Sequence, residues 1–294
     1  MISVLRTTIL VVLSLALAGV GSGQKPTLTA AEIVQRMTSK YANLTGYQDS
    51  GTVELSKDDS FVEGLSWEQV LTSDKFQPRR VVSFSLSFVR PDKLRFEWNN
   101  LDKAANRKSV VWWNHKRIYS WLPSSVENDD MFIWYAQPSI ARAIDEAGQS
   151  SSSVLMIIHN LLTRGNEYFS FTKMTQPKII REETVDGNSC YVIVGNISDD
   201  PWALWIDKNS FLLRKYRMQI ATGSFDESVR TGVMPVTIGE IRHHNIEINA
   251  RISNSVFDFR PTLKKGDMNI SRPKRERLIA PPLLSQEPKK SNEQ

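Results

Sequence analysis

The sequence from Ser83 to Trp98 is Ser-Phe-Ser-Leu-Ser-Phe-Val-Arg-Pro-Asp-Lys-Leu-Arg-Phe-Glu-Trp. Every second residue of 83–88 and of 94–98 is apolar, which is the period of a β-strand with one buried and one exposed face. Between these runs, Arg90-Pro-Asp-Lys93 is typical of a tight turn, because proline has the fixed φ that such a turn needs. The segment therefore predicts an antiparallel hairpin.

The same pattern recurs along the chain. Asp186-Gly187 is a strong two-residue turn signal, and a last long strand is expected over about Val236–Ile248. Since no crossover helices separate the strands, the sheet should be antiparallel. The further hairpins are expected at 110–113 with 117–122, at Ile179–Val185 with Ser189–Val194, and at Trp202–Ile206 with Phe211–Met218.

Three helices are expected beside the strands. Thr29-Ala-Ala-Glu32 is a capping box that begins a helix over about residues 30–44. Pro138–Ala147 predicts a short helix with proline in its first turn. Val154–Leu162 is apolar almost all round, so it should be covered on more than one side and lie inside the curve of the sheet. The expected fold is mainly antiparallel β with α: an incomplete, half-open β-barrel with an N-terminal helix and mid-chain lid or plug helices.

The two ends of the chain differ from its body. Residues 1–23 carry one basic residue, an apolar run and a small-residue end, which predicts a secretory signal peptide. We therefore expect a periplasmic or otherwise exported protein, soluble after cleavage, with a half-barrel domain over residues 24–260. Residues 261–294 contain 5 of the 13 prolines and 8 Lys/Arg against 4 Asp/Glu, which is typical of a basic flexible tail.

Charge excludes one class of partner. Residues 24–260 contain 28 basic and 28 acidic residues, so the body is neutral and does not resemble a nucleic-acid-binding domain. In the tail, the basic and apolar residues 272–284 suit contact with an anionic membrane surface or an envelope membrane protein. A solvated extension without a specific role is the alternative.

Motifs for catalysis are absent from the sequence. There is no nucleophile elbow, P-loop, dinucleotide fingerprint or zinc-protease motif, and we expect no catalytic residue, metal or cofactor. Cys190 is the single cysteine, and its default role is that of a small buried hydrophobe. His243 and His244 are adjacent on an expected strand, so their rings should point to opposite faces and cannot readily share a metal.

Large apolar side chains are concentrated on the expected strands. They can form an ordinary packed core, or they can line a cleft for an apolar ligand around the central helix. Strand alternation and helical spacing select nine candidate lining residues, although a one-residue register error would exchange the two faces. These candidates are Phe84, Leu86, Phe88, Leu94, Phe96, Trp98, Leu155, Ile158 and Leu162.

The order of these segments resembles the periplasmic LolA-like, outer-membrane lipoprotein-sorting proteins. The resemblance spans about residues 30–261 and is carried by Tyr41–Tyr47, Phe88–Phe96, Val111–Trp121, Val185–Ile193, Leu204–Arg214 and Phe257–Pro261. It implies a half-barrel with helices over its mouth, a cavity for lipoprotein acyl chains, and a strand arginine that holds the lid helices closed. The expected strand Gln48–Leu55 has no arginine, so that role is not assigned. The chain also departs from the pattern by an insertion around Ser56–Arg80.

Two functions follow as hypotheses. The first is a non-enzymatic exported carrier or binding protein for a lipid, a lipoprotein acyl chain or another long apolar ligand. The alternative is an envelope interaction or stress-sensing regulatory module that uses the same fold without transport. An enzyme is a distant third, since no nucleophile and base are recognisable together.

Overall fold

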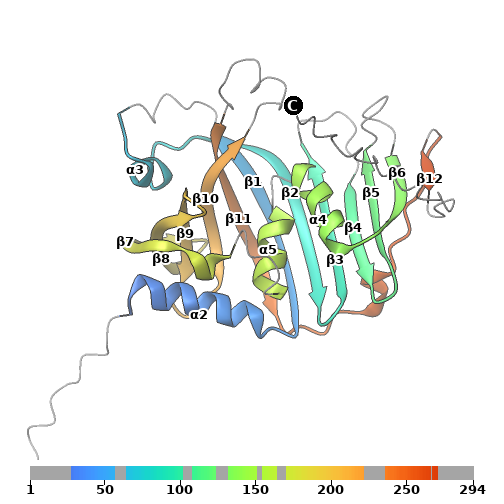
Figure 1. The fold of residues 1–294 in the computed structure, drawn as a ribbon, viewed down its shortest axis with the longest axis horizontal. Coiled ribbons are helices and arrows are strands. Elements are labelled where there is room, and N and C mark those ends of the chain that lie inside the picture. Colours follow the sequence, from blue (N-terminus) through green and yellow to red (C-terminus); the bar gives the residue numbers. More distant parts are fainter. Residues whose placement is uncertain are drawn as a thin grey trace, which may run out of the picture.

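The protein is described by a computed structural model over residues 28–56, 64–101, 108–123, 132–150, 154–163, 170–221, 236–265 and 267–270. In these ranges twelve strands form one curved sheet that does not close into a barrel, and three helices lie along one of its faces (Figure 1). The predicted signal peptide 1–23 and the basic segment 272–284 lie outside the described residues.

The sheet has the order β12-β6-β5-β4-β3-β2-β1-β11-β10-β9-β8-β7. Neighbouring strands are antiparallel, as expected from the hairpin pattern, except that β12 runs parallel to β6. The pairing of β1 with β11 joins the two halves of the chain in one sheet. The bounds are β1 Gly46–Ser56, β2 Pro78–Val89, β3 Lys93–Asn100, β4 Ser109–Asn114, β5 Ile118–Pro123, β6 Phe132–Gln137, β7 Thr175–Val185, β8 Asn188–Ile197, β9 Asp200–Asp207, β10 Leu213–Ala221, β11 Val236–Ile248 and β12 Met268–Ile270.

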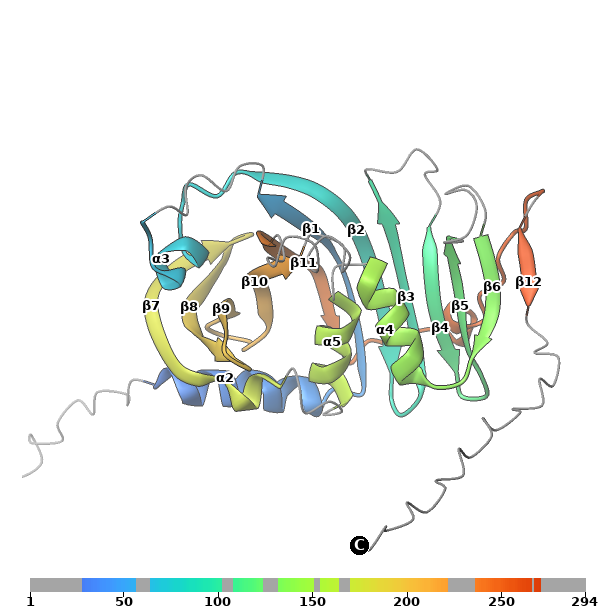
Figure 2. The same cartoon turned by 45° about the horizontal axis from the view of Figure 1, so that its top comes forward.

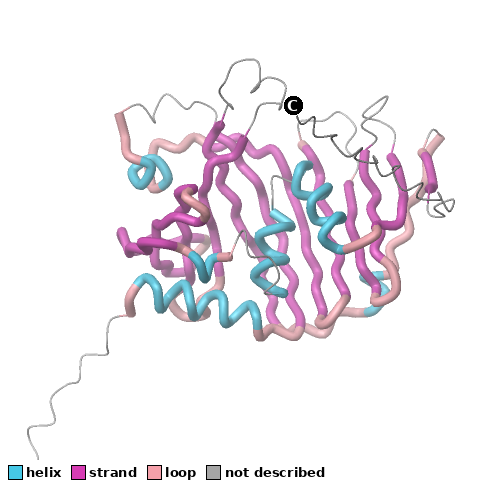
Figure 3. Tube along the Cα trace, in the orientation of Figure 1, coloured by secondary structure: helices cyan, strands magenta, loops and turns pink. Residues whose placement is uncertain are grey.

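Four α-helices accompany this sheet in the described ranges: α2 Ala30–Ala42, α3 Trp67–Leu71, α4 Ile140–Ser150 and α5 Val154–Thr163. Helix α2 begins with the expected capping box, in which the Glu32 carboxylate accepts from the Thr29 backbone N–H at 2.8 Å. Two short 3-10 helices occur at Phe171–Lys173 and Asn254–Phe257. Figure 2 shows how β7–β11 curve towards α2, and Figure 3 shows α4 and α5 beside the strands.

Most expected elements are present, with three additions. The Asp186-Gly187 turn joins β7 to β8, and both of its residues have positive φ, 48° and 78°. Strand β6 was not expected, and α3 forms within the insertion around Ser56–Arg80. The region from residue 261 was expected to be a flexible tail, yet Met268–Ile270 pairs with Ile133–Tyr135 of β6. Edge pairing with a distant strand leaves no periodic signal in so short a segment.

Apolar side chains are buried on both faces of the sheet. On the face that we call the inner face, residues of α2, α4 and α5 share one core cluster with residues of β1–β4 and β8–β11. On the opposite, outer face, Val70 and Leu71 of α3 share a second cluster with residues such as Val192, Trp205 and Ile238. The insertion therefore covers an apolar patch on the outer face that would otherwise meet water.

Candidate functional site

The nine candidate lining residues all lie on the inner face. Phe84, Leu86 and Phe88 of β2 pair with Trp98, Phe96 and Leu94 of β3, so the six side chains share one face of the hairpin. They are between 0% and 5% exposed, and the three α5 residues Leu155, Ile158 and Leu162 are fully buried in the same cluster. The structure thus brings the predicted set together in a packed interior. That they line a ligand cavity stays a prediction.

A set of buried polar residues lies within this apolar interior. Nδ1 of His243, on β11, is 2.6 Å from Oδ2 of Asp49, on β1, and both side chains are completely buried. The Tyr47 hydroxyl donates to the same Asp49 oxygen at 3.0 Å. The Tyr216 ring of β10 lies 5.9 Å from the His243 ring. We call Tyr47, Asp49, Tyr216 and His243 the inner polar cluster.

Local backbone geometry places this cluster on the inner face. The register of β1 against β11 shifts between Gln48 and Ser50, where the single β1 residue Asp49 lies opposite two residues of β11, Asn245 and Ile246. Against β2 the alternation of β1 is unbroken from Gly46 to Val53, and Asp49 pairs with Leu86, so its side chain lies on the same face as that candidate lining residue. Two residues on, Gly51 leaves room for the Phe84 ring, since a Cβ there would lie 2.3 Å from Phe84 Cζ. The Phe84 ring in turn contacts the His243 ring edge-on, with centroids 5.7 Å apart.

Three atoms of the inner polar cluster have no hydrogen-bond partner among the described residues: Asp49 Oδ1, His243 Nε2 and the Tyr216 hydroxyl. Burial, followed by the charge of Asp49, raises the pKa of Tyr216 far above its usual value, so its hydroxyl keeps its proton. The cluster therefore offers unused hydrogen-bonding capacity beside apolar side chains, and the nearby Trp202 Nε1 is likewise without a partner among the described residues.

Among the described residues, this arrangement lacks the nucleophile of a hydrolase triad. Asp49 orients the His243 ring as the acid orients the base in a catalytic triad. However, His243 Nε2 has no hydroxyl or thiol within hydrogen-bonding distance in the part of the chain that the structure describes. Cys190 is fully buried in the outer-face cluster, as expected, and burial raises the pKa of its thiol to about 11. Within the described residues, no group of three or more His, Cys, Asp and Glu side chains could hold a metal ion.

Arg90 connects the helices to the sheet. It follows β2, and its Nε donates to the Leu44 carbonyl at 2.6 Å while Nη2 donates to the Ala42 carbonyl at 2.7 Å. Nη2 also donates to the carbonyl of Leu162, near the end of α5. These carbonyls lie at helix C-termini, where free acceptors and partial negative charge favour a cation. One guanidinium therefore holds the ends of α2 and α5 together.

The resemblance implied a strand arginine that holds helices, and the expected strand Gln48–Leu55 has none; the arginine that contacts α2 and α5 is Arg90. Arg90 lies in the next hairpin, inside a motif already noted for its turn. The sequence does mark Arg90 as the residue before Pro91, but it does not show that the turn lies beneath two helix ends. The chemistry suits the task, since arginine has several donors in a fixed fork.

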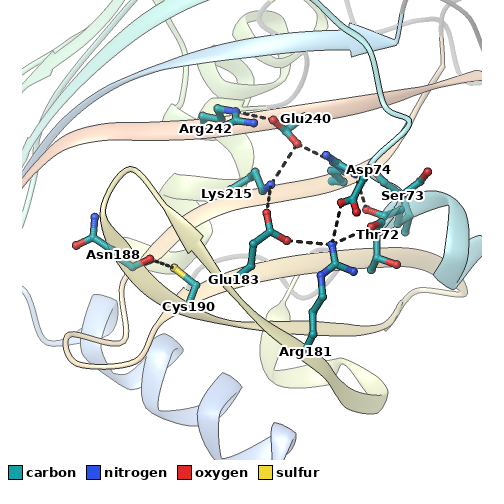
Figure 4. Close-up of polar contacts among 12 residues, drawn as sticks. Thr72, Ser73, Asp74, Arg181, Glu183, Asn188, Cys190, Lys215, Glu240 and Arg242 are labelled. Atoms are coloured by element: carbon teal, nitrogen blue, oxygen red, sulfur yellow. Dashed lines mark hydrogen bonds and ion pairs between the residues drawn. The ribbon is translucent and has the colours of Figure 1, made fainter.

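The outer face also carries a buried polar group, the outer charge cluster of Arg181, Glu183, Lys215, Arg217, Glu240 and Arg242. Figure 4 shows Glu240 between Arg242 and Lys215, and Glu183 between Lys215 and Arg181. Burial by itself raises the pKa of Glu240, but the charges of Arg217, Lys215 and Arg242 outweigh it and hold the pKa below its usual value. Arg217 Nε donates to Glu240 at 2.6 Å.

Helix α3 completes the outer charge cluster. Arg217 Nη1 donates to the carbonyls of Leu71 at 3.2 Å and Ser73 at 2.8 Å, and Arg181 donates to the carbonyl of Thr72 at 2.9 Å (Figure 4). These carbonyls end the short helix, so the cations cap it. We interpret this cluster as a structural anchor for the insertion.

Comparison with known proteins places the chain in a family. Residues 55–270 match the family described as predicted periplasmic protein DUF2092, and the chain belongs to that family. The description agrees with the expected periplasmic location. No helix in the described ranges is long and apolar enough to span a membrane. Comparison with curated proteins gives no match.

Several solved structures are similar to this chain. Lipoprotein LppX of Mycobacterium tuberculosis is 14% identical, with 76% of this chain and 97% of that chain covered and a TM-score of 0.40. The LolA superfamily protein NE2245 of Nitrosomonas europaea is 11% identical, with 79% and 98% covered and a TM-score of 0.31. The complex of MucA and MucB of Pseudomonas aeruginosa is 11% identical, with 78% and 60% covered and a TM-score of 0.37.

Proposed function

We propose that this protein binds a long apolar ligand, such as a lipid or the acyl chain of a lipoprotein, between the inner face of its sheet and helices α2, α4 and α5. It does so as a carrier or binding protein of the cell envelope, without catalysing a reaction. The observation that supports this most is the gathering of nine large apolar side chains from two strands and a helix in one interior. Each methylene of a chain buried there would contribute about 0.8 kcal/mol.

The manner in which the helices are held supports a reversible opening. Backbone hydrogen bonds join the strands of the sheet, whereas α2 and α5 meet the sheet through apolar contacts, the side chain of Arg90 and the hydrogen bond from the Leu213 N–H to the Tyr41 hydroxyl. Moving two helices away from a sheet breaks fewer hydrogen bonds than separating strands. When α5 moves away, apolar side chains on the inner face of the sheet become exposed. An acyl chain that binds there would cover this apolar surface again and so favour the open state.

Uptake of the fluorescent probe N-phenyl-1-naphthylamine tests this proposal. The wild-type protein, purified without detergent, should bind the probe with increased fluorescence. Ile158→Ala on α5 removes contacts at the inner face, so we expect about threefold or more weaker binding. The matched control is Ile238→Ala, the same change on the outer face, where Ile238 is 2% exposed.

The outcomes separate the two hypotheses for this fold. Arg90→Lys keeps the positive charge but loses the several guanidinium donors that join the ends of α2 and α5. The helices should then separate more easily, and the probe should associate faster. No uptake by the wild-type protein, together with co-purification of an envelope protein, would overturn the carrier proposal and favour an interaction module. Equal effects of Ile158→Ala and Ile238→Ala would show that the probe does not bind at the inner face.

A further inference from the structure

We propose that the inner polar cluster is a binding site for one neutral hydroxyl group of the apolar ligand, so that the protein selects long-chain alcohols or hydroxyl-bearing lipids over pure hydrocarbon chains and fatty-acid anions. This inference rests on the proposed function, because it names the polar part of the ligand that the inner face would hold. Its chemical basis is the set of three unpartnered atoms in Asp49, Tyr216 and His243.

The position of the cluster puts these atoms where an apolar ligand would lie. His243 is 1% exposed and Tyr216 is fully buried. Their rings contact each other, and the rings of Phe84 and Trp202 lie 5.7 and 5.8 Å from them respectively. Phe84 is also one of the nine candidate lining residues. A chain bound along the inner face of β2 would therefore pass beside this polar cluster.

The free energy of the unpartnered atoms favours a ligand. A buried donor or acceptor that lacks a partner costs about 1–3 kcal/mol, and such atoms are uncommon in folded proteins. Three of them lie on neighbouring strands here. A partner that enters with the ligand would recover part of this cost at the moment of binding, and would strengthen binding of the ligand that carries it.

The hydrogen-bonding roles of the three atoms identify the partner. Because Nδ1 of His243 is engaged by Asp49, Nε2 is the ring atom left for a ligand, and it can accept from a hydroxyl in one protonation state of the ring and donate to it in the other. Asp49 Oδ1 is a second acceptor, while the protonated Tyr216 hydroxyl can donate. A ligand hydroxyl both donates and accepts, so it can satisfy an acceptor of the cluster and the Tyr216 hydroxyl together. A carboxylate would bring a second negative charge towards Asp49, and this disfavours a fatty-acid anion.

A competition experiment tests the selection. Bound N-phenyl-1-naphthylamine is displaced by 1-hexadecanol, by hexadecane or by palmitate, and the concentration that displaces half of the probe is measured for each competitor. The readout is the concentration for hexadecane divided by that for hexadecanol, so a high ratio means that the alcohol binds more tightly. Tyr216→Phe should lower this ratio about three- to tenfold, because a hydrogen bond of about 1 kcal/mol is lost only for the alcohol. Hexadecane displacement should change little. The same variant should leave the weaker displacement by palmitate nearly unchanged.

Tyr41→Phe is the matched control. Tyr41 is also fully buried, but its hydroxyl already has partners: it accepts a hydrogen bond from the Leu213 N–H at 3.2 Å and is hydrogen-bonded to Tyr47. This variant should be less stable than the wild type while its hexadecane-to-hexadecanol ratio stays the same. Comparing the two variants separates a loss of ligand contact from a general loosening of the core.

Each outcome bears on the inference. A ratio that is the same in the wild type and in Tyr216→Phe would overturn it, and would indicate that ordered water satisfies the cluster. Stronger displacement by palmitate than by hexadecanol would also overturn it. If no competitor and no probe binds to the wild-type protein, the proposed function itself fails. If hexadecane and hexadecanol both bind and the ratio is insensitive to Tyr216, only the hydroxyl site fails.

Discussion

The inner polar cluster and the outer charge cluster lie on opposite faces of the sheet, and they differ in how completely their groups are paired. In the outer charge cluster, Glu240 faces Lys215, Arg217 and Arg242, and Arg217 also donates to two carbonyls at the end of α3. In the inner polar cluster, Asp49 and His243 bind each other but each leaves one atom unpartnered among the described residues.

From this difference we expect a structural role for the outer charge cluster and, under our proposal, a binding role for the inner polar cluster. Burying charge is costly unless opposite charges and hydrogen bonds compensate for it, and the outer charge cluster provides both. The inner polar cluster leaves hydrogen-bonding capacity unused in an apolar interior, which serves no purpose for a core that is simply packed. We expect the outer charge cluster to control stability and the inner polar cluster to control ligand choice.

The largest expected effect is on the outer face. Glu240→Gln removes the negative charge that compensates three buried or half-buried cations, so the free energy of unfolding should fall by about 3–5 kcal/mol. Urea denaturation followed by tryptophan fluorescence measures the change. Glu247→Gln, an exposed position on the same strand, is the control and should stay within about 0.5 kcal/mol of the wild type. A loss below about 1 kcal/mol for Glu240→Gln would contradict a structural role for this cluster.

The second effect is a pH dependence of the inner face. Burial lowers the pKa of His159, on α5, from 6.5 to about 4. Between these values the unfolded chain binds a proton that the folded chain does not, so stability falls as the pH falls from about 6.5 to about 4. The wild type should lose about 3 kcal/mol more than His159→Gln over this interval. Parallel urea curves at pH 7, 5.5 and 4 measure this; identical pH profiles of the two proteins would show that His159 is not buried uncharged.

The third prediction compares the stability of two variants that each lose one buried tyrosine hydroxyl. Tyr216→Phe removes a buried hydroxyl that has no partner among the described residues, so stability should change by less than about 1 kcal/mol and towards greater stability. Tyr41→Phe, which leaves the Leu213 N–H without its acceptor, should instead be destabilised by about 1 kcal/mol or more. Thermal unfolding of both variants provides the measurement. Equal destabilisation would mean that the Tyr216 hydroxyl is bonded in the ligand-free protein.

Much of the fold was predictable because it is encoded locally. Strand periodicity located the hairpin of β2 and β3, the Asp186-Gly187 turn located the next, and the Thr29–Glu32 capping box fixed the start of α2. The same alternation placed Phe84 and Phe96 on one face. These features depend on neighbours along the chain or across a tight turn, where residue type has a direct steric and hydrogen-bonding consequence.

The candidate site was predictable only in its apolar part. His243 was expected to point away from His244, and this is confirmed, since His243 is buried while His244 lies on the other side within 2.9 Å of Asp186. No local pattern pairs His243 with Asp49, which is 194 residues away. Arg90 was assigned only to a turn because its acceptors belong to α2 and α5, elsewhere in the chain.

Local sequence patterns were sufficient to predict most of the strands and helices, which of their faces are apolar, and that recognisable catalytic motifs are absent. The tertiary structure decided which distant residues meet: β1 beside β11, Arg90 beneath two helix ends, and Asp49 against His243. The physical reason is that periodicity records whether a side chain faces water or core, whereas the identity of its partner depends on the order of strands in the sheet.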